Sequence, residues 1–277
     1  MADNKFVFKD AEEARDDITK RDLKEIRKLY TQWSREIKQE YKAYRLNGGS
    51  DVARMRELAK MYYNMRNASK QMSYEINNLV VQSVTDMSDI VVRVNQRWLK
   101  SLGIDTSTLD VRYSYIKNNV VTNIITGNLY QDKKPLSSRV WDLSESHTKD
   151  IYTIIAKGIA QDMSIYDIAK LLEKYVNPRM RLPMYDGIHN RTVDYNAMRL
   201  ARTMVQHSYQ NTLVGVTRNN PYVKGYIWHV QSGHPCELCQ ERDGNFYTAS
   251  DIPLDHPNGQ CTFEIVTNIN LNPNIYQ

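Results

Sequence analysis

The residues best suited to chemistry lie near the end of the chain, between positions 234 and 261. All three cysteines fall in this stretch, and a histidine stands five residues before the last of them. A Cys-x-x-Cys pair directs two thiolates at one ion from a tight turn, and a histidine and a cysteine one loop further on complete a tetrahedron. The spacing therefore predicts a structural zinc site made by Cys236, Cys239, His256 and Cys261.

Two other interpretations of the cysteines stay open. A redox dithiol needs a helix that carries the pair, so that the helix N-terminus lowers the pKa of the first thiol. Asp243-Gly244 is instead a turn signal typical of a hairpin. Cysteines that only pack in a core are more often scattered than gathered beside histidines. His234 is a further nearby histidine, and we expect it to lie in a loop, because it stands only two residues before Cys236.

The segments around these residues predict a small β module. After Pro221 the apolar period changes from helical to alternating, with Tyr226 and Trp228 on one face. A second alternating run covers 261–267. The candidate ligands are therefore expected between two strands.

Most of the remaining chain has the apolar period of helices. Apolar residues recur every three or four positions along 10–46 and along 51–98, and Asn47-Gly48-Gly49 between them is a helix-ending signal. This pattern predicts a long antiparallel helical hairpin. Shorter helices are expected at 113–125, 136–141, 146–159, 165–176 and 192–216.

The predicted fold class is thus mostly α with a small C-terminal β module (α+β). Three consecutive domains are expected: the long hairpin at 1–100, a helical core at 101–220, and at 221–277 the β module with its zinc-stapled hairpin.

Length and composition agree with a globular protein. A chain of 277 residues with 11 glycines and 8 prolines can bury a substantial core and form mostly regular structure. No window approaches the length of a membrane span, and the first residues lack the apolar region of a signal peptide. An odd number of cysteines at metal-ligand spacing fits a reducing compartment. We therefore expect no membrane association.

Positive charge is concentrated between positions 174 and 224. This stretch has eight basic residues and only two acidic ones, in a chain whose net charge is +5. Such an excess can meet the phosphates of a nucleic acid or an acidic protein surface, or it can simply face solvent. The candidate nucleic-acid-binding residues are Arg179, Arg181, Arg191, Arg199 and Arg202.

Four segments in a fixed order carry a resemblance to a known family. They are Leu136-Ser-Ser-Arg-Val-Trp141, 165–172, Ala197-Met-Arg-Leu-Ala-Arg-Thr203, and the closing pattern Trp228…Cys236-x-x-Cys239…Asp243-Gly244…His256-Pro-Asn-x-x-Cys261. Together they resemble the minor head proteins of tailed bacteriophages, the head-morphogenesis family that includes the F protein of phage Mu. The resemblance covers about half the chain, roughly 129–266.

The chain departs from the family pattern in two places. The family commonly ends its motif His-Pro-Asn-Cys-Arg-Cys, whereas Gly259 and Gln260 stand here before the last cysteine. Ligation must therefore run through Cys261. The family also often has an acid after Ala-Arg-Thr, where this chain has Met204. Methionine cannot act there as a base, which argues against an enzyme.

The resemblance implies a non-enzymatic structural protein of a phage head. It would lie near the portal, act in head morphogenesis and handle packaged or ejected DNA. The implied partners are the portal or the major capsid protein, with sequence-independent DNA as a further partner and no small-molecule substrate. The implied location is the virion, and the host cytoplasm during assembly.

Two other functional classes are weighed against this one. The first is a zinc-dependent hydrolase or deaminase. A deaminase needs His-x-Glu before Pro-Cys-x-x-Cys, and no histidine of this chain has a glutamate two residues after it. The second is a zinc-ribbon regulator that binds nucleic acid, for which the sequence offers no recognition helix beside the zinc.

Overall fold

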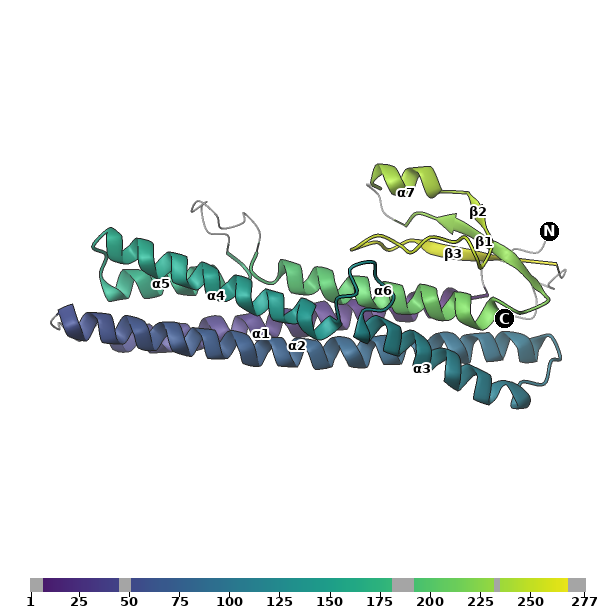
Figure 1. Cartoon of the computed structure of the whole chain (residues 1–277), viewed down its shortest axis with the longest axis horizontal. Helices are drawn as coiled ribbons and strands as arrows, with labels where there is room; N and C mark the ends of the chain where they lie inside the picture. Colours follow the sequence, from purple (N-terminus) through teal and green to yellow (C-terminus); the bar gives the residue numbers. More distant parts are fainter. Residues whose placement is uncertain (1–6, 45–50, 181–191, 232–234, 269–277) are drawn as a thin grey trace. The chain divides into compact units, whose positions relative to one another are not determined.

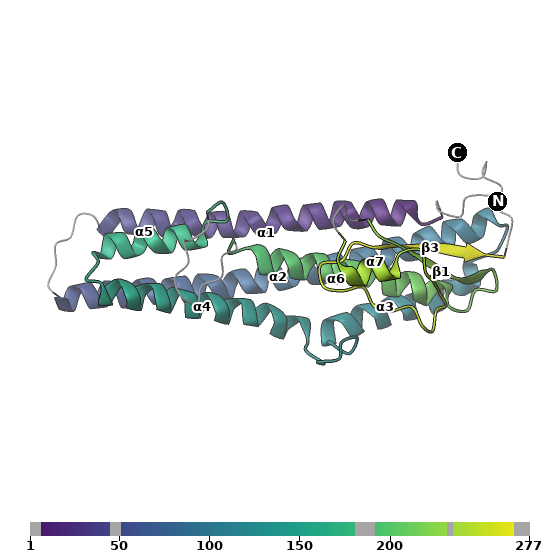
Figure 2. The same ribbon diagram turned by 90° about the horizontal axis from the view of Figure 1, so that it is seen from above.

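A computed structural model describes residues 7–44, 51–180, 192–231 and 235–268 (Figures 1 and 2). Of the described residues 71% are helical, and a small antiparallel sheet lies near the C-terminal end, so the expected α+β class is confirmed. The helices are α1 (Lys9–Tyr44), α2 (Asp51–Ser101), the short 3-10 helix η2 (Ser107–Leu109), α3 (Asp110–Thr126), α4 (Leu136–Ala160), α5 (Ile165–Val176), α6 (Tyr195–Thr217) and α7 (Glu237–Arg242). The strands are β1 (Val223–His229), β2 (Phe246–Tyr247) and β3 (Thr262–Thr267).

The chain forms two compact units, each assembled from segments that are far apart in the sequence. Unit 1 consists of Met1–Arg21, Val80–Pro135 and Arg199–Gln277, and unit 2 consists of Asp22–Leu79 and Leu136–Met198. These units cut across the three consecutive domains expected from the sequence, because α1, α2 and α6 each contribute residues to both.

The two long N-terminal helices have the apolar stripes that the sequence predicts. In unit 1 they run antiparallel, since Arg97 pairs with Asp10 at 2.9 Å and Arg21 with Asp86 at 3.5 Å. Met55, near the start of α2, is 53% exposed and lies outside the buried part of the stripe. The buried stripe of α2 in unit 2 consists of Leu58, Met61, Met65, Met72 and Ile76.

Unit 2 has a helical core in which α4 packs on α5. A β-carbon at Gly158 of α4 would lie 2.5 Å from the side chain of Ile168 on α5, so a glycine permits this close approach. His147 of α4 is among the polar side chains buried in this core, and it lies within hydrogen-bond distance of Tyr30 and Ser69.

Unit 1 contains the β module. In the described part of the chain, three strands form one antiparallel sheet in the order β2-β1-β3. Tyr226 and Trp228 of β1 and Phe263 of β3 are buried, and the Phe263 ring stacks on Tyr209 of α6 at 6.0 Å. The sheet therefore covers one face of α6 (Figure 1).

None of the helices in the described ranges combines the length and the apolar character needed to cross a membrane.

Candidate metal centre

Two short segments of unit 1 present the candidate ligands. Cys236 is the N-cap residue of α7, and Cys239 lies in the first turn of this helix. His256 belongs to the loop between β2 and β3, and Cys261 directly precedes β3. The sequence predicts a turn rather than a helix after the cysteine pair. This prediction was wrong, because the residues that begin with Glu237 form the short helix α7. The turn follows α7 at Gly244, whose φ is 75°.

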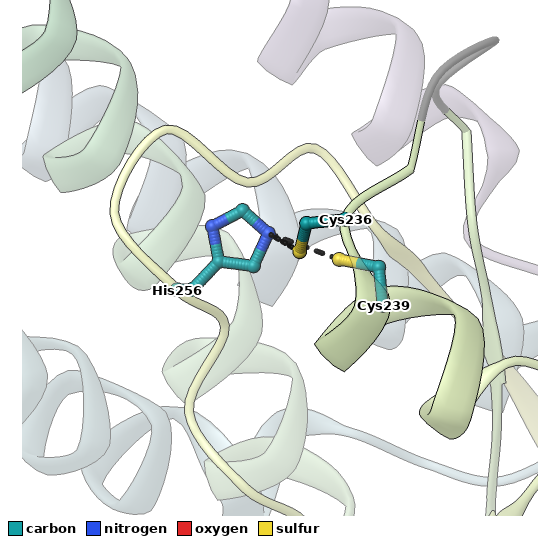
Figure 3. A group of neighbouring side chains, drawn as sticks. All are labelled: Cys236, Cys239 and His256. Carbon is teal, nitrogen blue, oxygen red and sulfur yellow. Dashed lines mark hydrogen bonds between the residues drawn. The ribbon is translucent and has the colours of Figure 1, made fainter.

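The four side chains predicted as ligands meet in one cluster. Nε2 of His256 lies 3.4 Å from Sγ of Cys236 and 2.9 Å from Sγ of Cys239 (Figure 3). Sγ of Cys239 lies 3.6 Å from Sγ of Cys261. Metal–sulfur bonds of about 2.3 Å and metal–nitrogen bonds of about 2.0 Å place neighbouring ligand atoms of a tetrahedron about 3.5–3.8 Å apart. The cluster can therefore hold a metal ion.

The ring of His256 has the orientation of a ligand. Its Nδ1 lies 3.0 Å from the carbonyl oxygen of Pro257, which can accept a hydrogen bond from Nδ1–H. In that tautomer the lone pair is on Nε2, the nitrogen that points at both sulfurs in Figure 3.

The buried sulfurs need a nearby cation to ionise. Burial raises the pKa of the Cys239 thiol well above its ordinary value, and the neighbouring Cys261 and Cys236 raise it further. Burial also raises the pKa of Cys261, to which the Asp255 carboxylate adds. A bound cation reverses this balance, because it stabilises the thiolates directly.

A row of polar side chains on α6 holds the loop that carries His256 and Cys261. Gln206 donates to Oδ2 of Asp255 at 2.9 Å and to the carbonyl oxygen of Cys261 at 2.7 Å. Gln210, one turn further, donates to the carbonyl oxygen of Pro253 and accepts from the backbone N–H of Asp255.

The row continues toward the start of α6. Thr203 accepts a hydrogen bond from the backbone N–H of Asn258 at 2.8 Å, and Arg202 donates to the side chain of the same asparagine. Nε2 of His207 lies 2.9 Å from the carbonyl oxygen of Asp255. The row has the spacing of one side of a helix, and its members are Arg202, Thr203, Gln206, His207 and Gln210. Sequence reasoning missed this row, although that spacing of polar residues was its signal.

The buried side chain of Asp255 holds the backbone of the loop through hydrogen bonds. Its carboxylate accepts hydrogen bonds from the backbone N–H groups of His256 at 2.8 Å and Cys261 at 3.2 Å. A β-carbon at Gly259 would lie 2.3 Å from this carboxylate. The departure from the family pattern at Gly259 thus has a physical reason in this chain, because the carboxylate occupies the space that a side chain would need.

A buried arginine completes the network. Nη1 of Arg15, on α1, donates to Oε1 of Gln206 and to the carbonyl oxygen of Cys261, both at 3.1 Å. Arg15 is 4% exposed. Its charge partner Asp16 accepts from the same guanidinium at 2.8 Å.

The candidate nucleic-acid-binding arginines differ in their surroundings. Arg179 and Arg199 are exposed, the first in unit 2 and the second in unit 1. Arg202 is half-buried against the metal loop, a contact that the sequence did not predict. Arg181, Arg191 and His234 lie outside the described residues. Phosphate binding by these arginines stays a prediction.

No family model, curated protein or solved structure matched the chain. The interpretation of the centre therefore depends on its geometry, and the family resemblance stays a prediction.

Proposed function

We propose that Cys236, Cys239, His256 and Cys261 bind one structural zinc ion. Thiolate and imidazole ligands select zinc among the common divalent ions, and the separations of Cys236 from His256, 3.4 Å, and of Cys239 from Cys261, 3.6 Å, are close to the edges of a tetrahedral site. Four protein ligands leave no position open for a substrate or a reactive water, which favours a structural role over a hydrolase or a deaminase.

The ion would supply a cross-link that a small β module needs. The module is small, and its ligands come from two segments that the chain brings together only on folding. One pair of ligands fixes α7, and the other pair fixes the loop that α6 holds through Gln206 and Gln210. Zinc binding is therefore expected to stabilise the contact between the sheet and α6.

Metal analysis tests this proposal. Protein purified without chelator should contain about one zinc per chain. His256→Ala should lower that content strongly, whereas His234→Ala should leave it unchanged, because the sequence places His234 in a loop outside the ligand set. Metal-free wild-type protein, or equal zinc loss in both variants, would refute the assignment.

We further propose that the chain is a minor head protein of a tailed bacteriophage that acts in head morphogenesis near the portal. The observation that supports this most is that two of the segments on which the resemblance depends contact each other. Arg202 and Thr203, at the end of the Ala197–Thr203 segment, bind Asn258 of the closing motif. Segments that are more than 50 residues apart in the sequence thus form one assembly, as expected when a shared pattern reflects a shared fold.

Head assembly tests the functional proposal. The chain should be expressed with the portal and major capsid proteins of the same phage or prophage, and the heads separated on a density gradient. We expect it to co-sediment with heads that contain the portal, and in lower amount with heads assembled without it. Its absence from both kinds of head and from free portal would contradict the proposal.

A further inference from the structure

Unit 2 has exposed aromatic side chains along the seam between α2 and α4. Tyr63 is 57% exposed, Trp141 47% and Tyr152 64%. Half-buried Tyr62 joins two of them, with ring centroids 5.7 Å from Tyr63 and 6.4 Å from Tyr152. Single exposed aromatic residues are ordinary, but several along one seam are typical of an interaction site. We call Tyr62, Tyr63, Trp141 and Tyr152 the aromatic strip.

Contacts across the seam fix which residues of the two helices are level with each other. Tyr62 contacts Tyr152 at one end, and at the other Nζ of Lys70 lies 5.4 Å from the ring centroid of Trp141. The two helices are therefore antiparallel, and they run side by side in both views (Figures 1 and 2). The strip extends over eight residues of α2, about 12 Å.

Two opposite charges stand at the middle of the strip without a partner. Arg66 lies on α2 one turn from both Tyr62 and Lys70, and Glu145 lies on α4 one turn from Trp141. Among the described residues, neither side chain makes a hydrogen bond or an ion pair, and Nε of Arg66 is also buried without an acceptor. Hydrogen bonds between a guanidinium and a carboxylate are strong because both groups are charged, so a partner that places a carboxylate beside Arg66 would be stabilised.

The arrangement is self-complementary. A two-fold axis parallel to the helices keeps each residue at its own level and places α2 of one copy against α4 of the other. Arg66 would then face Glu145 of the partner subunit, twice in one interface, with aromatic rings on both sides. We propose that a second copy of this chain docks on the aromatic strip and forms such a two-fold dimer.

The charges favour a second copy over other occupants. A nucleic acid or an acidic protein would bring negative charge to Glu145 as well as to Arg66, whereas a second copy satisfies both. Tyrosine, tryptophan and arginine are also the residues enriched at the centres of protein interfaces.

Sedimentation of the full-length protein tests the dimer. We expect a mass near twice the 32.4 kDa of one chain. Arg66→Glu and Glu145→Arg should each weaken dimerisation about tenfold or more, because each places like charges face to face. The double variant Arg66→Glu/Glu145→Arg should restore it, since the pairs re-form with their charges exchanged.

A matched pair of tyrosine variants locates the interface. Tyr152→Ser should weaken the dimer, whereas Tyr115→Ser on α3 of unit 1 should not, although Tyr115 is 70% exposed. Circular dichroism verifies that every variant is folded. A monomer at about 100 µM, a double variant no better than the single ones, or an equal effect of both tyrosine variants would overturn the proposal. The test uses no head protein, so its outcome is independent of the proposed phage function.

Discussion

Asp255 and Gly259 occupy adjacent space in the metal loop. The carboxylate accepts hydrogen bonds from two backbone N–H groups and from Gln206, and it needs the room that the missing side chain leaves. A larger residue at position 259 would displace the carboxylate and, with it, the backbone that carries His256 and Cys261.

We therefore expect Gly259→Ala to destabilise the zinc-loaded protein by about 1–3 kcal/mol, as for other overpacked sites. The zinc dissociation constant should rise as well, because the loop geometry is disturbed. Thermal unfolding and a competitive zinc titration measure the two effects. Gln260→Ala, at the exposed neighbour, is the matched control and should change neither. An alanine variant with wild-type stability and affinity would show that the loop adapts.

The exposed arginines carry the prediction about DNA. If Arg179 and Arg199 neutralise phosphates, binding of duplex DNA should be independent of sequence and weaken steeply with salt. Filter binding of Arg179→Glu/Arg199→Glu should then show a log–log salt slope reduced by about two. If the same arginines face an acidic portal or capsid surface, this variant loses co-assembly instead. Absence of DNA binding by the wild type at low salt would end the DNA hypothesis for the isolated protein.

At the scale of the element, α6 contacts both the sheet and the metal loop. Apolar residues such as Tyr209 and Leu213 pack under the strands, whereas the polar row that contains Gln206 holds the loop. All of the row except the half-buried Arg202 is buried, so each lost hydrogen bond leaves a buried partner unsatisfied.

Gln206→Ala should accordingly cost about 1–3 kcal/mol of stability, because Asp255 and the carbonyl oxygen of Cys261 lose a donor and Arg15 loses an acceptor. Asn196→Ala, on the exposed face of the same helix, is the control. Chemical denaturation measures both. Equal small effects in the two variants would mean that water replaces Gln206 in this network.

The elements that the sequence predicted well are those with a sustained period. Helices expected at 10–46 and 51–98 are observed as Lys9–Tyr44 and Asp51–Ser101. The long apolar stripes indicate the two helices, and the glycine pair between them indicates where the first one ends. The six residues of α7 and the two of β2 are too short to show a period, and both were missed. The ligand types and spacing predicted the cluster, but its support by α6 depends on contacts some 45 to 55 residues apart in the sequence, which local patterns do not encode.

At the scale of the whole molecule, the division into two units means that different conditions should act on different parts. Unit 1 contains the candidate metal centre, and unit 2 buries His147. Burial lowers the pKa of His147 from its ordinary value of 6.5 to about 4, although a hydrogen bond with the backbone of Val193 opposes the shift. The unfolded chain therefore binds one more proton than the folded chain between these two pH values.

Stability should consequently be full above pH 6.5 and fall as the pH drops toward 4. The loss attributable to His147 is up to about 3 kcal/mol, at about 1.4 kcal/mol for each pKa unit. His147→Gln should remove this part of the pH dependence, and denaturation at several pH values, with hydrogen exchange of unit 2 peptides, measures it. Identical pH profiles for the variant and the wild type would contradict the shift.

The unequal exposure of the three sulfurs has a kinetic consequence. Cys236 is exposed, whereas Cys239 and Cys261 are buried. A chelator or an oxidant dissolved in water would therefore reach a bound ion from the Cys236 side, and this thiolate should be the first ligand to leave. Release of the ion to a competing ligand should accelerate with the concentration of that ligand, so a centre that is thermodynamically tight can still exchange its metal rapidly.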